Sequence, residues 1–167
     1  MKHHAHRSSS GTSFNHQKHR AKQWKQEHSA GGFRCSHCKQ FVVINNIMGT
    51  VNRNHCNICL WSKHVDTAKG DRKATCKGGM RPIGLTFKHE GLGKIGELML
   101  VHNCTMCEKI SINRLARDDF EHNILEIFAE SQHLSKELRD KCRQANIYLL
   151  TKADTVELRS QLFGTAS

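Results

Sequence analysis

Seven of the eight cysteines stand at spacings that suit metal ligation. Six of them form three C-x2-C pairs, and the seventh stands alone between the second and third pairs. Two thiolates separated by two residues in a tight turn can bind one ion, and soft sulfur suits Zn2+. An even number of cysteines also allows a disulfide framework, but the repeated pairs fit metal binding better. The predicted ligands are Cys35, Cys38, Cys56, Cys59, Cys76, Cys104 and Cys107.

A histidine is needed to complete the ligand count. Seven thiolates make one set of four and one set of three, so two tetrahedral Zn2+ sites require one further ligand. His64 follows the second pair at a finger-like distance, and we expect it to be that ligand. His55 is the competing residue, but it directly precedes Cys56 and points away from the turn more easily.

The surroundings of the pairs predict which thiolates share an ion. Residues 33–43 and 98–112 have the same pattern, with apolar residues before a C-x2-C pair and β-branched residues after it. This pattern is typical of a zinc knuckle, in which a strand leads into the turn and another leads out. Because a zinc ribbon is two knuckles closing on one ion, we expect the first pair to join the third. The second pair would then join Cys76 and His64. The competing arrangement joins the first pair to the second, with seventeen residues between the two pairs, which is an ordinary ribbon spacing.

The segments that must position these residues predict a small α+β protein. Residues 1–32 are rich in His, Ser, Lys and Gly and poor in apolar residues, as in a disordered basic arm. Residues 33–117 predict a zinc-ribbon-like, β-rich module with two zinc knuckle sites. Apolar residues recur at helical steps from Asp118 onward, so residues 118–167 predict a helical C-terminal extension. Structural zinc would offset the low apolar content of 37%, because metal binding supplies folding free energy.

The sequence predicts a cytoplasmic location. No run of eighteen apolar residues occurs, so we expect no transmembrane helix and no membrane partner. The N-terminus carries charge without an apolar segment, unlike a secretory signal. Thiols that serve as zinc ligands also require a compartment in which they stay reduced.

Charge is distributed unevenly along the chain. Residues 1–34 carry a net charge of +6 and residues 35–117 a net charge of +8, whereas residues 118–167 carry −3. The first two parts are therefore suited to a polyanion, most simply a nucleic acid. RNA, and ribosomal RNA in particular, is the preferred partner, because small basic zinc modules with disordered arms suit irregular, densely charged targets.

The central motifs resemble those of the RNHCP domain family, over about residues 33–119. The Arg-Asn-His-Cys core of that family is matched by residues 53–56, and Asn57 replaces its proline. Asparagine also serves turns, so this departure should alter the rigidity of the turn more than the ligation. The resemblance implies a small zinc-ribbon-like protein and does not by itself assign a reaction. The further motifs that carry it are Gly70-Asp71-Arg72, Cys76, Met80 to Ile83, Val101 to Cys107 and Asn113 to Asp119.

Basic residues near the knuckles and in the arm are the candidates for phosphate contacts. Asp66, Asp71 and Asp118 would orient arginines through bidentate pairs, while Trp24 and Trp61 would stack on unpaired bases. The alternative is structural, with the Arg/Asp pairs bracing a small core and Trp61 covering a zinc site. The candidate nucleic-acid contacts are Lys18, Arg20, Lys22, Trp24, Lys25, Arg53, Lys63, Arg72, Lys73, Arg114 and Arg117.

These features favour a binding module over an enzyme. The leading hypothesis is a structural-zinc, RNA-binding protein associated with the ribosome. A competing hypothesis is a zinc-dependent nuclease or hydrolase, in which His55 and Asp66 or Asp71 act beside a zinc with an open ligand position. Two further hypotheses are a DNA-binding zinc ribbon and a protein–protein adaptor that uses the helices of residues 118–167. A zinc site that lacks a fourth protein ligand would favour the enzyme.

Overall fold

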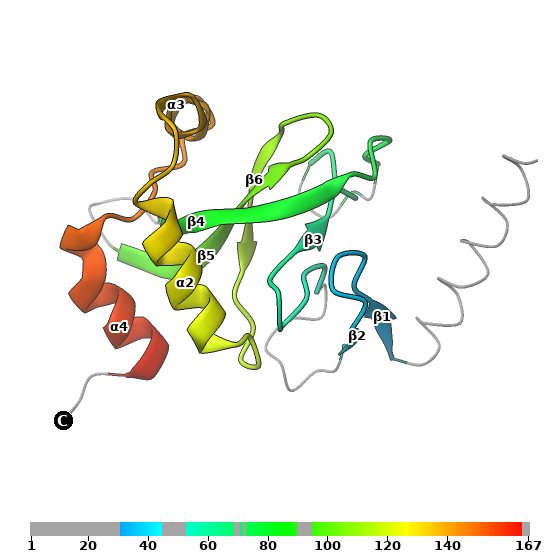
Figure 1. Ribbon diagram of the computed structural model, residues 1–167, viewed down its shortest axis with the longest axis horizontal. Helices are drawn as coiled ribbons and strands as arrows, with labels where there is room; N and C mark the ends of the chain where they lie inside the picture. The colour runs from blue at the N-terminus through cyan, green and yellow to red at the C-terminus, as the bar shows by residue number, and fades with distance from the viewer. Residues whose placement is uncertain (1–30, 45–52, 69–70, 72, 90–94, 165–167) are drawn as a thin grey trace, which may run out of the picture.

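The computed structural model describes residues 31–44, 53–68, 71, 73–89 and 95–164. These ranges contain two antiparallel sheets followed by helices, in the α+β arrangement that the sequence predicts (Figure 1). The elements are β1 (Gly32–Arg34), β2 (Phe41–Val43), β3 (Ser62–Lys63), β4 (Gly79–His89), β5 (Ile95–Cys104), β6 (Ile110–Arg114), α2 (Glu121–Ser131), α3 (Lys136–Gln144), the 3-10 helix η2 (Lys152–Asp154) and α4 (Thr155–Phe163).

The larger sheet has the strand order β3-β4-β5-β6. Its centre is the long pair β4–β5, in which Leu85 lies opposite Leu100, and β6 pairs with β5 from Met99 to Asn103. The smaller sheet is the hairpin β1–β2, with Phe33 opposite Val42. Strands of three residues are marginal by themselves, so this hairpin depends on what it packs against.

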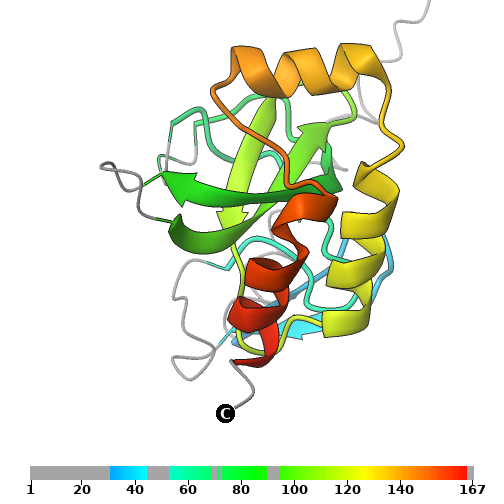
Figure 2. The same ribbon diagram turned by 90° about the vertical axis from the view of Figure 1, so that its left-hand side faces the viewer.

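The two faces of β5 pack against different helices. Leu98 and Leu100 point toward α2 and α4, where they form the main core with Ile124 and Leu158. Figure 2 shows these two helices side by side over the sheet. Successive side chains of a strand point to opposite faces, so Val101 points the other way and packs with Cys142 of α3. Burial of each such side chain contributes about 1.5–3 kcal/mol.

The helices complete the core of the β-rich module. Leu158 of α4 and Ile124 of α2 are almost wholly buried against the sheet, and Gln161 of α4 bonds the backbone of β5. The module and the helices therefore share one main hydrophobic core. The basic arm predicted for residues 1–32 lies almost wholly outside the described residues, which include only its last two positions, and Gly32 already belongs to β1. None of the described helices is long and apolar enough to cross a membrane.

Candidate metal centres

All three C-x2-C pairs form the same backbone turn, so the knuckle occurs three times in the chain and not only twice. In each turn the N–H of the first cysteine donates to the carbonyl five residues later, at 2.8–2.9 Å. The residue after the second cysteine donates to the carbonyl of the first at 3.0–3.1 Å and has a positive φ. Only the first and third turns showed the repeat in sequence, because β-branched residues do not follow the second. The positive-φ residues are Lys39 (66°), Leu60 (59°) and Glu108 (61°).

The first candidate centre joins the first knuckle (Cys35/Cys38) to the second (Cys56/Cys59), with all four sulfurs within 4.8 Å of one another. The Cys35–Cys59 and Cys38–Cys56 sulfur pairs are each 3.6 Å apart. Zinc–sulfur bonds of about 2.3 Å in a tetrahedron place two sulfurs about 3.8 Å apart, whereas a disulfide requires about 2.05 Å. The four free thiols therefore fit a closed tetrahedral zinc site.

The second candidate centre joins His64 and Cys76 to the third knuckle (Cys104/Cys107). The sulfurs of Cys76 and Cys104 are 3.6 Å apart, and His64 Nδ1 lies 3.3 Å from Cys107 Sγ. A tetrahedral zinc with one imidazole ligand requires a nitrogen–sulfur separation of about 3.6 Å, close to this distance. Gly78 leaves room for the centre, since a Cβ there would lie 2.9 Å from Cys104 Sγ. The two ligand sets thus fit two zinc ions.

The pairing that we expected between the first and third knuckles is wrong. Strand pairing explains the difference, because β3 pairs with β4 and β4 pairs with β5. That ladder brings His64, directly after β3, to the knuckle at the end of β5. The second knuckle precedes β3 and instead meets the β1–β2 hairpin, where Val42 packs with Cys35 and Cys56. The competing arrangement, at the ordinary ribbon spacing, is the one that the structure has.

The thiols of the first centre share their protons unequally. Hydrogen bonds from Cys56 and Cys59 stabilise the Cys35 thiolate and hold its pKa well below the ordinary value. The hydrogen bond to Cys35 in turn raises the pKa of Cys56 to about 11, and bonds to Cys35 and Cys56 raise the pKa of Cys59. Zinc requires thiolates, so its binding must displace the protons that these cysteines retain.

Trp61 packs between the two centres. Its ring is stacked on His37 of the first knuckle, with ring centroids 4.1 Å apart and planes 3° from parallel. Its far edge lies against Gly79 at the start of β4, where a Cβ would be 3.2 Å from the ring. Trp61 therefore connects the first knuckle to the strand that leads past the second centre. One ring face is occupied by His37, which agrees with the structural alternative for this residue.

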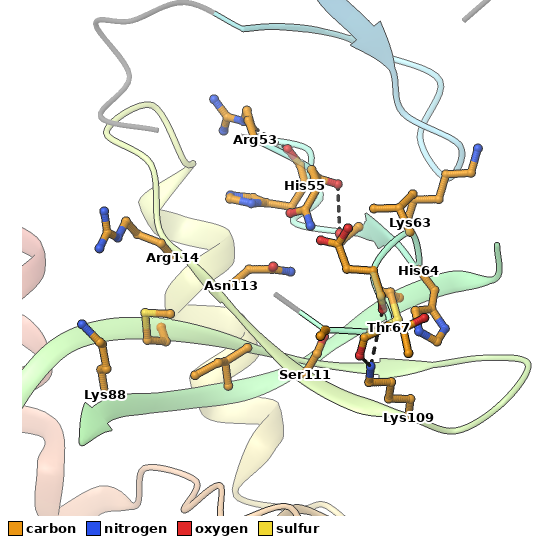
Figure 3. A pocket seen from close by; sticks show the side chains of 18 of the residues that line it. Arg53, His55, Lys63, His64, Thr67, Lys88, Lys109, Ser111, Asn113 and Arg114 are labelled. Carbon is orange, nitrogen blue, oxygen red and sulfur yellow. Dashed lines mark hydrogen bonds between the residues drawn. The ribbon is translucent and has the colours of Figure 1, made fainter. Parts of the chain in front are cut away.

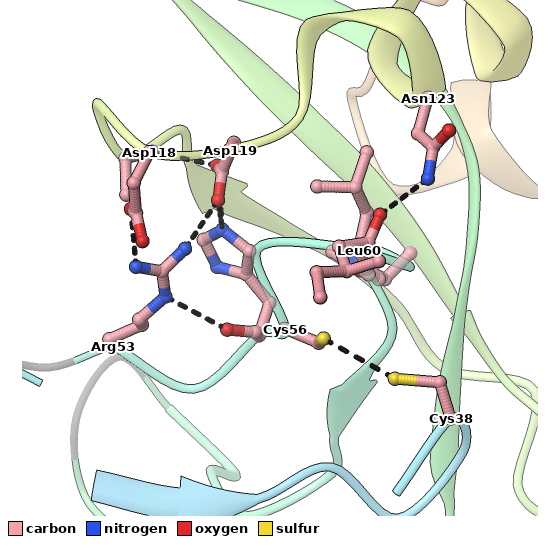
Figure 4. A network of polar contacts seen from close by, with 11 residues as sticks. Cys38, Arg53, Cys56, Leu60, Asp118, Asp119 and Asn123 are labelled. Carbon is pink, nitrogen blue, oxygen red and sulfur yellow. Dashed lines mark hydrogen bonds and ion pairs between the residues drawn. The ribbon is translucent and has the colours of Figure 1, made fainter. Parts of the chain in front are cut away.

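Arg53 is buried, so the phosphate contact that we predicted for it is wrong (Figure 4). Its side chain has no exposed surface and bonds Asp118 and Asp119, each at 2.5 Å, while its Nε donates to the carbonyl of His55. His55 is itself 1% exposed, and its Nε2 lies 2.8 Å from Asp119. The Arg-Asn-His motif thus ties the second knuckle to the segment before α2, as in the structural alternative.

The carboxylate to which His55 is hydrogen-bonded is not one that the hydrolase hypothesis named. The carboxylate bonded to His55 belongs to Asp119, whereas Asp71 accepts three backbone N–H groups of its own loop. These bonds, from Lys73, Ala68 and Thr67, lower the pKa of Asp71. Each candidate centre also has four protein ligands, whereas a catalytic zinc usually has three.

His102 is a buried polar residue to which the sequence analysis assigned no role. Its Nε2 lies 2.8 Å from the carbonyl of Leu60, so this nitrogen carries the proton and donates it. Nδ1 therefore accepts from Asn113 Nδ2, at 3.1 Å. Burial lowers the pKa of His102 to about 4, so the ring is neutral. The residue joins the second knuckle to β5 and β6.

The remaining predicted nucleic-acid contacts are exposed or lie outside the described residues. Lys63, Lys73 and Arg117 are exposed, and Arg114 is exposed while bonding Glu97 at 2.8 Å. The contacts predicted at Lys18, Arg20, Lys22, Trp24, Lys25 and Arg72 fall outside the described ranges.

An open groove of about 500 Å3 lies between residues 53–68 and β6 (Figure 3). We call it the β6 groove. Cationic side chains of Lys63, Lys88, Lys109 and Arg114 contribute to its lining, and Figure 3 shows them on different sides of it. The lining also includes Asp66, Met80, Met99, Ser111 and Asn113.

The RNHCP domain model matches residues 30–125, which is more than half of the 167-residue chain. The matched range begins just before β1 and ends within α2, so it contains both candidate centres and the Arg53 network. No curated protein matches the chain. No solved structure matches it either.

Proposed function

The chain belongs to the RNHCP domain family, and from this premise we propose that it is a structural-zinc protein that binds RNA. Four protein ligands at each centre give zinc a structural role, which leaves recognition to the surface around the knuckles. A cytoplasmic location, where thiols stay reduced, belongs to the same proposal.

The charge of the exposed surface supports this proposal most strongly. In the described part of residues 33–117, eight Lys and Arg residues are exposed, whereas Glu108 is the single exposed acidic residue. Such a surface attracts phosphates and gains affinity by releasing their counterions. The exposed cations are Arg34, Lys39, Lys63, Lys73, Lys77, Arg81, Arg114 and Arg117.

Binding to a structured RNA at increasing salt tests the proposal. The full zinc-loaded chain is titrated against a labelled RNA stem-loop and against DNA of the same sequence, at roughly 50 and 200 mM salt. We expect tighter binding to RNA, and an affinity that falls at least about a hundredfold between the two salt concentrations. RNA affinity that is absent, or that barely responds to salt, would contradict the proposal. Equal affinity for both nucleic acids would favour the DNA-binding hypothesis.

Charge variants separate surface recognition from general attraction. Replacing Lys73 and Arg117 by glutamine should reduce the salt dependence by about one ion for each lost phosphate contact. Lys136→Gln is the matched control, because Lys136 is exposed on α3, within the acidic C-terminal part of the chain. Equal effects of the Lys136 variant and of either module variant would show that these module positions make no contact.

Ribosome association is the more specific part of the proposal. The chain should co-sediment with ribosomes at low salt and leave them at high salt, as expected for contacts to ribosomal RNA phosphates. A stable protein partner in the absence of RNA would instead favour the adaptor hypothesis, for which the exposed Tyr148, Val156 and Phe163 offer apolar contacts.

A further inference from the structure

The β6 groove has the size of a binding site for a small ligand. Its volume of about 500 Å3 falls within the range of roughly 300–1,000 Å3 that such sites occupy. It lies at β6, an outer strand of the larger sheet, beside residues that precede and follow the second knuckle. The buried Arg53 network contributes to one wall, so part of the groove rests on a rigid support.

Polar atoms of the groove are left without partners by the hydrogen bonds of the fold. His102 Nε2 donates to the carbonyl of Leu60, so its Nδ1 must accept a hydrogen bond. Of the two polar atoms of the Asn113 amide, the nitrogen is the one that can donate to Nδ1. The Asn113 oxygen is therefore the atom that remains for a ligand. Within the described part of the chain, neither this oxygen nor the hydroxyl of Ser111 has a hydrogen-bond partner.

Apolar and charged side chains complete the lining. Met80 and Met99 also line the groove, but at 2% and 8% exposed they offer a ligand little surface. Glu97 is shared by Arg114, at 2.8 Å, and Lys88, at 3.6 Å, so this group of three keeps a net positive charge. Lys109 adds another cation and bonds the carbonyls of Asp66 and Thr67.

We propose that the β6 groove binds one unpaired nucleotide of an RNA loop, with its base beside Ser111 and Asn113 and a phosphate toward the cations. This inference rests on the proposed function and specifies the part of the RNA that is recognised. Splayed, unpaired bases are what proteins read in RNA, because the deep major groove of an RNA helix excludes side chains.

Guanine fits the polar groups of the groove best. The Asn113 oxygen is an acceptor, and the Ser111 hydroxyl can also accept. Guanine presents N–H donors along one edge, and its O6 and N7 accept from arginine or lysine. Adenine and cytosine each offer one amino group there, and uracil offers a single ring N–H, so they can satisfy fewer of these acceptors.

Free nucleotides test the site without an RNA. Amide NMR spectra of the zinc-loaded full chain are followed while the four nucleoside monophosphates are added separately, with inorganic phosphate as the control. We expect shifts at Asp66, Ser111 and Asn113, and guanosine monophosphate to bind roughly tenfold more tightly than the others. Equal shifts with phosphate alone, or no shifts in the groove with any nucleotide, would overturn the inference.

Two substitutions at one position provide a matched pair. Ser111→Phe fills the groove and should abolish the nucleotide shifts, whereas Ser111→Ala removes only the hydroxyl and should weaken binding a few-fold. Zinc content and thermal melting check that both variants fold. If Ser111→Phe folds but binds guanosine monophosphate normally, the groove is not the site.

The outcomes also separate this inference from the proposed function. If RNA binds tightly and Ser111→Phe leaves that affinity unchanged, the groove inference is wrong and the proposed function stands. If guanosine monophosphate shifts the groove while no RNA binds, RNA recognition is wrong and the nucleotide site stands.

Discussion

His55 Nε2 lies 2.8 Å from the carboxylate of Asp119, although 64 residues separate the two in the chain. The same carboxylate accepts from the Arg53 guanidinium and from the backbone N–H of Ala116. One buried acid therefore holds the entrance of the second knuckle, the end of β6 and the start of α2 together. Two residues of the Arg-Asn-His-Cys motif, Arg53 and His55, therefore bond the same carboxylate, that of Asp119.

Removing the shared carboxylate should destabilise the protein strongly. Asp119→Ala leaves the Arg53 guanidinium buried beside one remaining, partly exposed acid, and breaking a buried ion pair costs about 3–5 kcal/mol. Urea denaturation of the zinc-loaded protein measures the change. Glu97→Ala is the control, because its ion pairs with Lys88 and Arg114 are partly exposed and should contribute at most about 1 kcal/mol. Similar losses in the two variants would contradict this account of the network.

Pairs of cysteine variants should reveal which knuckles share zinc. We expect two zinc ions per chain, and replacing Cys38 and Cys56 together by serine should remove one, because both belong to the first centre. Replacing Cys38 and Cys104 together should remove both ions, because they belong to different centres. Elemental analysis after gel filtration gives the count. The opposite result, with two ions lost from the first variant, would restore the pairing of the first knuckle with the third.

Chelation should first release the β1–β2 hairpin. Its described core consists of Val42 and Phe33 around cysteine ligands, whereas the larger sheet buries several leucines against the helices. Without zinc, strands of three residues cannot hold the hairpin together. Hydrogen exchange after limited chelation should therefore show lost protection at β1 and β2 before β4 and β5. Simultaneous loss in both sheets would show that their stabilities are not separable.

Substitutions at two residues with the same backbone conformation should change stability in opposite directions. Lys39 is exposed at φ 66°, so Lys39→Gly should relieve left-handed strain and stabilise by about 0.5–1 kcal/mol, whereas Lys39→Val should destabilise. Leu60 has φ 59° but is fully buried, so Leu60→Gly should cost at least about 2 kcal/mol. Chemical denaturation measures all three variants. A loss on Lys39→Gly would show that strain is unimportant in the knuckle.

Cys142 should stay unreactive in the folded protein. Burial raises the pKa of this thiol above its ordinary value, whereas the unfolded chain ionises near about 8.5. The unfolded state therefore loses its proton first, so the stability that Cys142 contributes is present below about pH 8.5 and decreases as the pH rises through that value. The stability difference from Cys142→Ala should shrink above this pH. Iodoacetamide labelling of the folded chain at Cys142 would contradict the burial.

Local chemistry accounts for what the sequence alone determined. The C-x2-C spacing indicated zinc ligation, because two thiolates at this spacing can bind one ion in any fold. Seven cysteines also left one ligand position to be filled by a histidine. The helical periodicity after Asp118 similarly predicted α2, α3 and α4. An amphipathic helix repeats its apolar residues about every 3.6 positions, and this pattern can be read within one segment without knowing its neighbours in space. His64 completes a ligand set as predicted, but with the third knuckle and not with the second knuckle that it follows in the chain.

Tertiary structure decided how these parts combine. The ladder from β3 through β4 to β5 sets which knuckles share an ion, and strand pairing between distant segments leaves no trace in local spacing. The same is true of Arg53, a surface cation by sequence, which is buried because Asp118 and Asp119 return to it 65 and 66 residues later. The β6 groove also forms only when residues 53–68 lie beside β6. Residue type and spacing thus determined the chemistry of each ligand, while long-range packing decided which side chains meet, since burial and neighbouring charge exist only in the folded chain.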